Sequence, residues 1–164
     1  MKTLTIIRHA KAEKPQPGEP DKFRKLRKKG IKQTKQVARR MHESNFVIEA
    51  AFVSTGTRAQ ETARLIKEQG GFDCPLTPDD ALYTFDYRDL IRFVHSIDDT
   101  YHRVAIIGHN PALTLLVTEI SDKNLLNIPT CGVVQVDFEL DSWKEIGKKS
   151  GRIRHFFTPQ SDDI

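Results

Sequence analysis

Short apolar runs rich in β-branched residues alternate with longer amphipathic segments along most of the chain. The apolar runs have the length and composition of buried strands, and they occupy residues 4–7, 50–54 and 104–107. The amphipathic segments repeat their apolar residues every three or four positions, which predicts helices at 28–43, 57–69, 85–97 and from Pro111 onward. This alternation predicts the α/β class, with a mostly parallel sheet between two layers of helices.

The pattern changes beyond Pro129, where strand-like segments follow one another without a helix between them. Residues 133–139 and 152–156 are expected to close the sheet and to add an antiparallel strand near the C-terminus. Prolines in the segment 14–20 predict a loop because they fix φ and remove hydrogen-bond donors. No repeat or domain boundary interrupts the sequence, so residues 1–164 are predicted to form a single three-layer α/β/α domain.

Length and composition limit the class of protein. A chain of 164 residues buries about two thirds of its unfolded surface and needs no disulfide or metal to fold. No apolar stretch approaches the ~18 residues of a membrane span, and the run after Lys2 lacks a signal-peptide cleavage site. We therefore expect a cytoplasmic protein with no membrane partner. Cys74 and Cys131 are expected to be inert, because two distant cysteines make neither a disulfide framework nor a zinc site.

The formal net charge of +4 reflects a concentration of Lys and Arg between residues 22 and 29. Because Phe23 is the only aromatic residue within this run, stacking on single-stranded nucleic acid is poorly supported, and no nucleic-acid partner is expected. A charge run at the start of a helix is most often a solvated face. The alternative is that it steers an anionic substrate or contacts an acidic protein surface.

Two of the predicted strands each deliver a histidine at their carboxyl end. His9 follows the run 4–7 directly after Arg8, and His109 follows the run 104–107. Ligands of open α/β sheets bind at this edge. The turn that starts at Ser54 enters the next helix through Arg58, so it offers backbone N–H groups and a guanidinium to an anion. Several arginines around one point favour a phosphoryl group as the ligand.

A histidine next to such cations can attack phosphorus, because the cations disfavour its protonated form. His9 is therefore the candidate nucleophile, and it would form a phosphohistidine that water then hydrolyses. His109 would hydrogen-bond the transferred phosphoryl oxygens. Either histidine alone would more simply be a satisfied core residue, but two strand-terminal histidines with nearby arginines favour a catalytic site.

These residues carry a family resemblance. Arg8-His9-Ala10, the segment 54–62 and Gly108-His109-Asn110-Pro111 together resemble the histidine phosphatase superfamily, and the short chain is most similar to its small phosphohistidine phosphatases of the SixA type. The resemblance implies a metal-independent phosphatase without a cofactor. It implies a phosphate pocket built from Arg8, His9, Arg24, Arg58 and His109. Asn110 is a further candidate phosphate contact.

The chain departs from larger members of this superfamily, which supply a carboxylic acid to protonate the leaving group. The position after the second histidine is Asn110, and Asp86 is the nearest candidate acid. Asp86 also stands where an acidic residue commonly caps a helix, and the cap is the favoured interpretation. Phosphohistidine needs little acid help, because its P–N bond is weak and its imidazole leaving group can already be protonated.

Three functions are compatible with the sequence. The first is a phosphatase for phosphohistidine on a protein, whose basic run could contact an acidic partner. The second is a phosphatase for small phosphomonoesters, which requires an acid such as Asp86. The third is a phosphate-binding interaction module without turnover. The complete set Arg8, His9, Arg58 and His109 disfavours the third.

Overall fold

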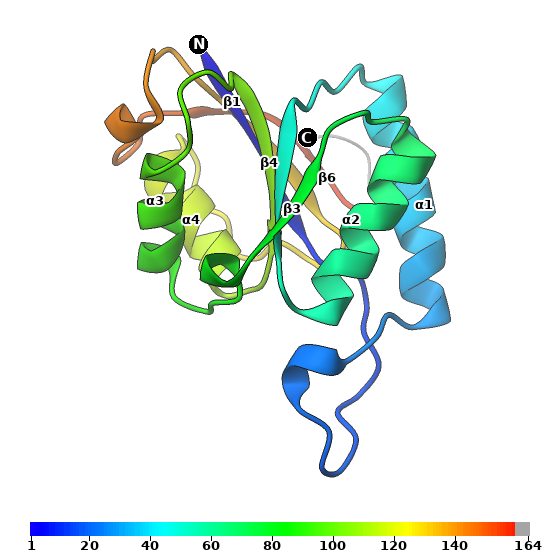
Figure 1. Ribbon diagram of the computed structural model, residues 1–164. Coiled ribbons are helices and arrows are strands. Elements are labelled where there is room, and N and C mark those ends of the chain that lie inside the picture. The colour runs from blue at the N-terminus through cyan, green and yellow to red at the C-terminus, as the bar shows by residue number, and fades with distance from the viewer. Residues whose placement is uncertain (160–164) are drawn as a thin grey trace.

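A central sheet separates two layers of helices (Figure 1). The structure is a computed structural model and describes residues 1–159. The strands are β1 (Lys2–Arg8), β2 (Ala50–Ser54), β3 (Leu76–Asp79), β4 (Arg103–Gly108), β5 (Val133–Phe138) and β6 (Arg152–Phe157). The α-helices are α1 (Lys28–Glu43), α2 (Thr57–Gly70), α3 (Tyr87–His95) and α4 (Ala112–Ile120), and the short 3₁₀ helices are η1 (Asp21–Phe23), η2 (Asp80–Leu82) and η3 (Trp143–Glu145).

The sheet has the strand order β3-β2-β4-β1-β5-β6. Strands β3, β2, β4 and β1 pair in parallel, whereas β5 is antiparallel to both β1 and β6. The predicted α/β class, with an antiparallel strand near the C-terminus, is confirmed. Strand β3 is absent from the sequence-based prediction, because this edge strand is only four residues long, contains Pro78 and buries none of its residues.

The two helical layers are packed through alternating side chains of the sheet. In β1, Leu4 and Ile6 join the core beneath α3 and α4, whereas Ile7 joins the core beneath α1 and α2. Both faces of the sheet are therefore apolar, which explains why the inner strands appear in the sequence as continuous apolar runs. Among residues 1–159, no helix is long and apolar enough to cross a membrane.

The ends of the helices follow their capping residues. Helix α1 and strand β2 span the predicted residues, but α3 is shorter than predicted because the Asp86 side chain caps it by accepting a hydrogen bond from the Arg88 N–H. Helix α4 begins at Ala112, with Pro111 at the N-cap position rather than inside the helix. These differences of one or two residues leave the arrangement of the layers unchanged.

Strands β1 and β4 bring the two predicted histidines to one edge of the sheet. Arg8 pairs with Gly108 in the parallel register, and the His9 N–H donates to the Gly108 carbonyl at 3.1 Å. His9 and His109 are the residues that follow this last pair. Helix α1 packs closely against the next part of the loop, where the Arg27 N–H donates to the Lys11 carbonyl at 2.9 Å.

Gly30 permits this close approach of α1, and its replacement tests how tightly the loop after β1 is held. A Cβ at Gly30 would lie 2.3 Å from the Lys11 carbonyl oxygen, so Gly30→Ala requires the backbone to move. We expect a loss of about 1–3 kcal/mol in the free energy of unfolding, measured by urea denaturation. Gly147→Ala is the control, since no atom comes closer than 4.0 Å there. Equal stability of the two variants would contradict this role.

Candidate active site

His9 is held in one tautomer at the carboxyl end of β1. Its ring is 9% exposed, and Nδ1 lies 2.7 Å from the Ala10 carbonyl oxygen. Because a carbonyl can only accept a hydrogen bond, Nδ1 carries the proton and Nε2 carries the lone pair. The Nε–H of Arg58 donates to this Nε2 at 3.3 Å. The unprotonated nitrogen of His9 thus lies next to the guanidinium group of Arg58.

The surroundings of His9 keep its imidazole neutral. Burial lowers the pKa of His9 to about 4, and the positive charges of Arg58, Arg8 and Arg24 also lower it, whereas the hydrogen bond to the Ala10 carbonyl acts in the opposite direction. The imidazole is therefore neutral throughout the neutral pH range, with its one proton on Nδ1. This is the state that a nucleophilic histidine requires.

His109 lies beside His9, and their ring centroids are 5.2 Å apart. His109 is 1% exposed, and its Nε2 is 2.6 Å from the Ser54 hydroxyl oxygen. The same oxygen accepts a hydrogen bond from the Gly56 N–H. Burial, together with the neighbouring His9, lowers the pKa of His109 to about 3. Ser54 at the end of β2 is thus a partner of His109 that the sequence analysis included only as part of a turn.

Two predicted phosphate ligands have buried polar atoms without a partner. Arg58, in the first turn of α2, is 2% exposed, and Arg8 donates from NH1 to the Ile128 carbonyl at 3.0 Å. Among residues 1–159, three buried side-chain polar atoms lack a hydrogen bond, and two of them are Arg8 Nε and His109 Nδ1. An unsatisfied buried donor costs about 1–3 kcal/mol. His109 Nδ1 is a donor in the tautomer in which Nε2 accepts from the Ser54 hydroxyl, and in that state an anionic ligand would relieve both groups.

Asp21 of η1 is a component of the site that the sequence analysis missed. Its carboxylate accepts hydrogen bonds from Arg58 NH2 at 3.0 Å, from Arg24 Nε at 3.0 Å and from the Tyr83 hydroxyl at 2.7 Å. Although burial raises the pKa of Asp21, the hydrogen bonds from Tyr83 and Arg58 and the charge of Arg58 hold it at about 2. Arg24 therefore joins the site through Asp21. The only signal in the sequence is an acidic residue three positions before Arg24.

Comparisons with known proteins agree with this geometry. Residues 4–95, more than half of the chain, match the model of the histidine phosphatase superfamily (branch 1). The chain belongs to this superfamily. A search of curated proteins gave no match.

Among solved structures, this histidine phosphatase is similar to the putative phosphohistidine phosphatases SixA from Nakamurella multipartitia and Agrobacterium tumefaciens. The first has a TM-score of 0.84 at 16% identity, with 98% of this chain and 97% of that chain covered. The second has a TM-score of 0.80 at 19% identity, with 96% and 99% covered. A mycobacterial glucosyl-3-phosphoglycerate phosphatase follows at a TM-score of 0.67 and 13% identity, with 93% and 97% covered. At these identities the likeness concerns the fold.

The Asn110 side chain in this histidine phosphatase is occupied by structural hydrogen bonds. Its amide nitrogen donates to Asn127 Oδ1 at 3.1 Å and to the Ile128 carbonyl at 2.8 Å. Its amide oxygen accepts from the backbone and the hydroxyl of Thr114 at 3.1 and 2.9 Å. The amide thus connects the start of α4 to the loop before β5, and its predicted contact with phosphate gains no support from these bonds.

Asp86 has the environment of a helix cap. Its carboxylate accepts a hydrogen bond from the Arg88 N–H at 2.9 Å and forms an ion pair with the Arg88 guanidinium at 2.9 Å. These hydrogen bonds lower the pKa of Asp86. The group is therefore an ionised carboxylate at neutral pH, which is unfavourable for a proton donor.

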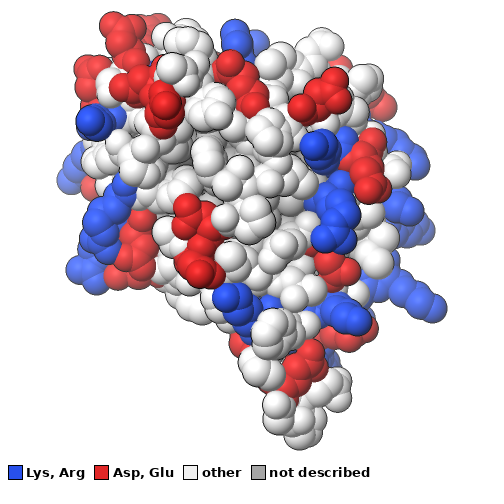
Figure 2. Space-filling view, in the orientation of Figure 1, with Lys and Arg blue, Asp and Glu red and all other residues white. Residues whose placement is uncertain are grey.

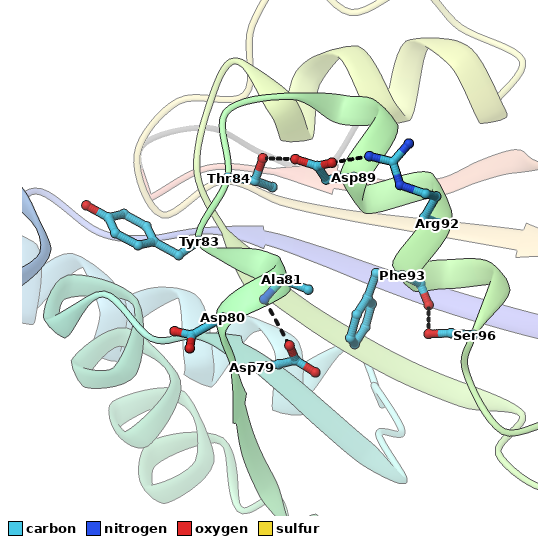
Figure 3. Close-up of a pocket in the computed structure, with 9 residues that line it drawn as sticks. All are labelled: Asp79, Asp80, Ala81, Tyr83, Thr84, Asp89, Arg92, Phe93 and Ser96. Carbon is cyan, nitrogen blue, oxygen red and sulfur yellow. Dashed lines mark hydrogen bonds and ion pairs between the residues drawn. The ribbon is translucent and has the colours of Figure 1, made fainter.

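The aromatic rings of Tyr83 and Phe85 border the histidine pair on the side of His109. The ring centroids of Tyr83 and Phe85 lie 5.2 and 5.6 Å from that of His109, and Phe85 is 50% exposed. Tyr83 also borders a pocket of about 460 Å³ (Figure 3), which lies beside the histidines without including them. The Asp89 carboxylate in this pocket is already bonded to Thr84 and Arg92. Within the described part of the chain, no cluster of His, Cys, Asp and Glu could hold a metal ion.

The depressed pKa values of the two histidines predict a pH-dependent stability. An unfolded histidine has a pKa of about 6.5. Between pH 6.5 and about 4, His9 and His109 are therefore protonated in the unfolded chain and neutral in the folded protein. The free energy of unfolding is therefore highest above pH 6.5 and decreases as the pH falls toward 4, by an amount on the order of 1–3 kcal/mol per histidine.

Urea unfolding between pH 7.5 and 4.5 measures this effect. Asp21 contributes little to this interval, because its pKa of about 2 in the folded protein and of about 3.9 in the unfolded chain both lie below pH 4.5. The variant His9→Ala should show a shallower dependence, since one of the two buried groups is gone. An identical slope in wild type and variant would show that His9 titrates normally in the folded protein.

Proposed function

We propose that this protein is a phosphatase that takes a phosphoryl group onto Nε2 of His9 and then hydrolyses the phosphohistidine. The observation that carries this proposal is the state of the His9 ring, whose Nδ1 is bonded to the Ala10 carbonyl while Nε2 keeps its lone pair. The low pKa of about 4 supports the same role, because the lone pair is available at neutral pH.

The reaction has two displacements at phosphorus. In the first, the Nε2 lone pair of His9 forms a bond to phosphorus, and the bond to the leaving group breaks with its electron pair going to the leaving group. In the second, water attacks phosphorus and loses a proton to solvent, and the P–N bond breaks so that its electron pair returns to Nε2. The leaving group takes up one proton, which a phosphohistidine substrate can already carry on its imidazole ring. The overall reaction consumes one water molecule and yields the dephosphorylated leaving group, inorganic phosphate and His9 in its initial state.

The arginines around His9, together with the neutral ring of His109, would stabilise the charge on the phosphoryl oxygens during both steps. Arg58 is already 3.3 Å from Nε2, and Arg8 and His109 contribute the unpartnered buried nitrogens. Fixed donors in a buried site stabilise the transition state without reorganisation. Arg24 would contribute from the opposite side of Asp21, where it lies within the electrostatic reach of His9.

We infer that the substrate is phosphohistidine on a protein. Neither candidate proton donor suits an alkoxide leaving group, because Asp86 is an ionised helix cap and the Asn110 amide is occupied by other hydrogen bonds. An imidazole leaving group tolerates this deficit, whereas an alkoxide does not. The SixA phosphatases whose fold this chain shares are named for such substrates.

The charge distribution supports a protein substrate with an acidic surface. Lys25, Arg27, Lys28 and Lys29 are exposed, and among the ion pairs of residues 1–159 none involves these four side chains. Figure 2 shows basic side chains gathered along the side of the molecule that α1 and α2 form. Lys28 and Lys29 stand in the first turn of α1, where the helix dipole disfavours positive charge. Binding to carboxylates would compensate this repulsion.

A phosphatase for small phosphomonoesters is the second candidate. The observation in its favour is the shared fold with the mycobacterial glucosyl-3-phosphoglycerate phosphatase. This function requires a proton donor for the alkoxide, and the lowered pKa of Asp86 opposes it. A binding module without turnover is the third candidate, and the neutral, oriented His9 ring argues against it.

Two substrates and two variants test the proposal. Phosphate release is measured in the presence of a chelator from a histidine-phosphorylated protein and from an alkyl phosphate. We expect the wild type to hydrolyse the phosphohistidine and largely to leave the ester. His9→Ala should abolish turnover, and Arg58→Ala should reduce it about 100-fold or more through lost charge stabilisation.

Each other outcome is informative. Retained turnover in folded His9→Ala would refute the nucleophile, and a change below tenfold in Arg58→Ala would refute its role. Preference for the ester would establish the phosphomonoesterase, and silence of the wild type on both substrates would favour the binding module. Unfolding curves of each variant show whether the protein is still folded when its turnover is lost.

A further inference from the structure

The carboxylate of Asp21 stands where an anionic ligand of Arg58 would stand. Arg58 donates from Nε to His9, from NH1 to the Asp21 backbone carbonyl at 2.9 Å and from NH2 to the Asp21 carboxylate at 3.0 Å. The other carboxylate oxygen of Asp21 is 2.9 Å from Arg24 NH2. Two guanidinium groups thus converge on one carboxylate, in the arrangement with which they would hold two oxygens of a phosphoryl group.

We propose that Asp21 is an internal anion of the phosphate site: it holds Arg58 and Arg24 in place in the empty site, and it must release them when phosphate binds. The inference rests on the proposed function only in taking Arg58 as a ligand of phosphate. Asp21 acts through the arginines, so it is a positioning residue that sets the affinity of the site for phosphate.

The location of Asp21 in the chain suits such an exchange. It lies in η1, within the segment 12–27 that projects from the body of the molecule (Figure 1). The base of this segment is closed by the bridge between Ala12 and Leu26 and by the bond from Glu13 N–H to the Lys25 carbonyl at 2.8 Å. Asp21 can therefore leave Arg58 through a shift of η1 while the base of the segment stays closed.

The side-chain bonds that hold η1 to the body are polar and partly exposed. The Asp21 side chain is 44% exposed, and it contacts Arg58 and Tyr83. Lys22 adds an ion pair to Asp80 at 3.2 Å, in which the Asp80 side chain is 82% exposed. This Lys22–Asp80 pair is exposed, and such pairs contribute only about 0–1 kcal/mol each. Arg58 is itself buried, so a ligand displaces Asp21 by offering Arg58 a more strongly charged anion.

Charge decides the competition between Asp21 and phosphate. Asp21 brings a single negative charge to Arg58, whereas a phosphoryl group at neutral pH carries up to two charges and offers three oxygens. A phosphoryl group would also reach the buried nitrogens of Arg8 and His109 that have no hydrogen-bond partner while Asp21 occupies Arg58. Phosphate therefore displaces the carboxylate when it binds. After hydrolysis the carboxylate returns to Arg58, which weakens the hold on the product and favours its release.

Calorimetric titration with inorganic phosphate tests this inference on the full chain. Asp21→Asn keeps the shape of the side chain and removes its charge, so we expect the Kd for phosphate to fall at least tenfold. Unchanged or weaker binding would overturn the inference, because Asp21 would then serve only to hold the arginines.

Tyr83→Phe provides a second test that keeps the Asp21 carboxylate. This variant removes one hydrogen bond to Asp21, so the Kd should fall in the same direction by about threefold. Weaker binding in this variant would overturn the inference even if Asp21→Asn failed to fold. Asp98→Asn is the matched control, since this exposed carboxylate caps the turn at Thr100 before β4, and its Kd should equal that of the wild type.

The readout separates this inference from the proposed function. Binding of phosphate does not require turnover, so failure of the phosphatase assay would leave the titration interpretable. Conversely, an active phosphatase whose phosphate affinity does not rise in Asp21→Asn would retain the function and lose the inference.

Discussion

The parallel pairing of β1 with β4 is the constraint on which the site depends. Because Arg8 pairs with Gly108, the residues that follow them, His9 and His109, leave the sheet side by side with ring centroids 5.2 Å apart. Apolar cores on both faces hold this pair of strands in register, since a slip of one residue would exchange the side chains of the two faces. The precision of the site is thus a property of the sheet.

The buried polar groups of the site lower the stability of the fold, whereas the apolar sheet raises it. Arg58 is almost completely buried, and Arg8 and His109 each keep a buried nitrogen without a partner. Burial is the main cause of the two low histidine pKa values, and the charge of Arg58 lowers both of them and the pKa of Asp21 as well. A site with this positive charge is organised to receive an anion before the anion arrives, which is the arrangement that phosphoryl transfer requires.

Much of this arrangement could be predicted from the sequence, because buried strands and amphipathic helices have distinct periods and parallel strands share one functional edge. Strand β3 could not, since an exposed four-residue edge with Pro78 has no apolar pattern. Asp21 could not either, because its role depends on the folding of segment 12–27 back onto Arg58, 37 residues along the chain. The predicted roles of Arg8, His9, Arg58 and His109 remain those proposed from the geometry.

The central claim is that Nε2 of His9 carries the phosphoryl group during turnover. Rapid alkaline quenching of the enzyme during hydrolysis of a ³²P-labelled phosphohistidine protein, followed by peptide mapping, tests it most directly. Alkaline conditions preserve phosphohistidine, and the account predicts that the label is found on the peptide that contains His9, bonded at Nε2. Label on His109, or turnover without any labelled enzyme, would contradict the account.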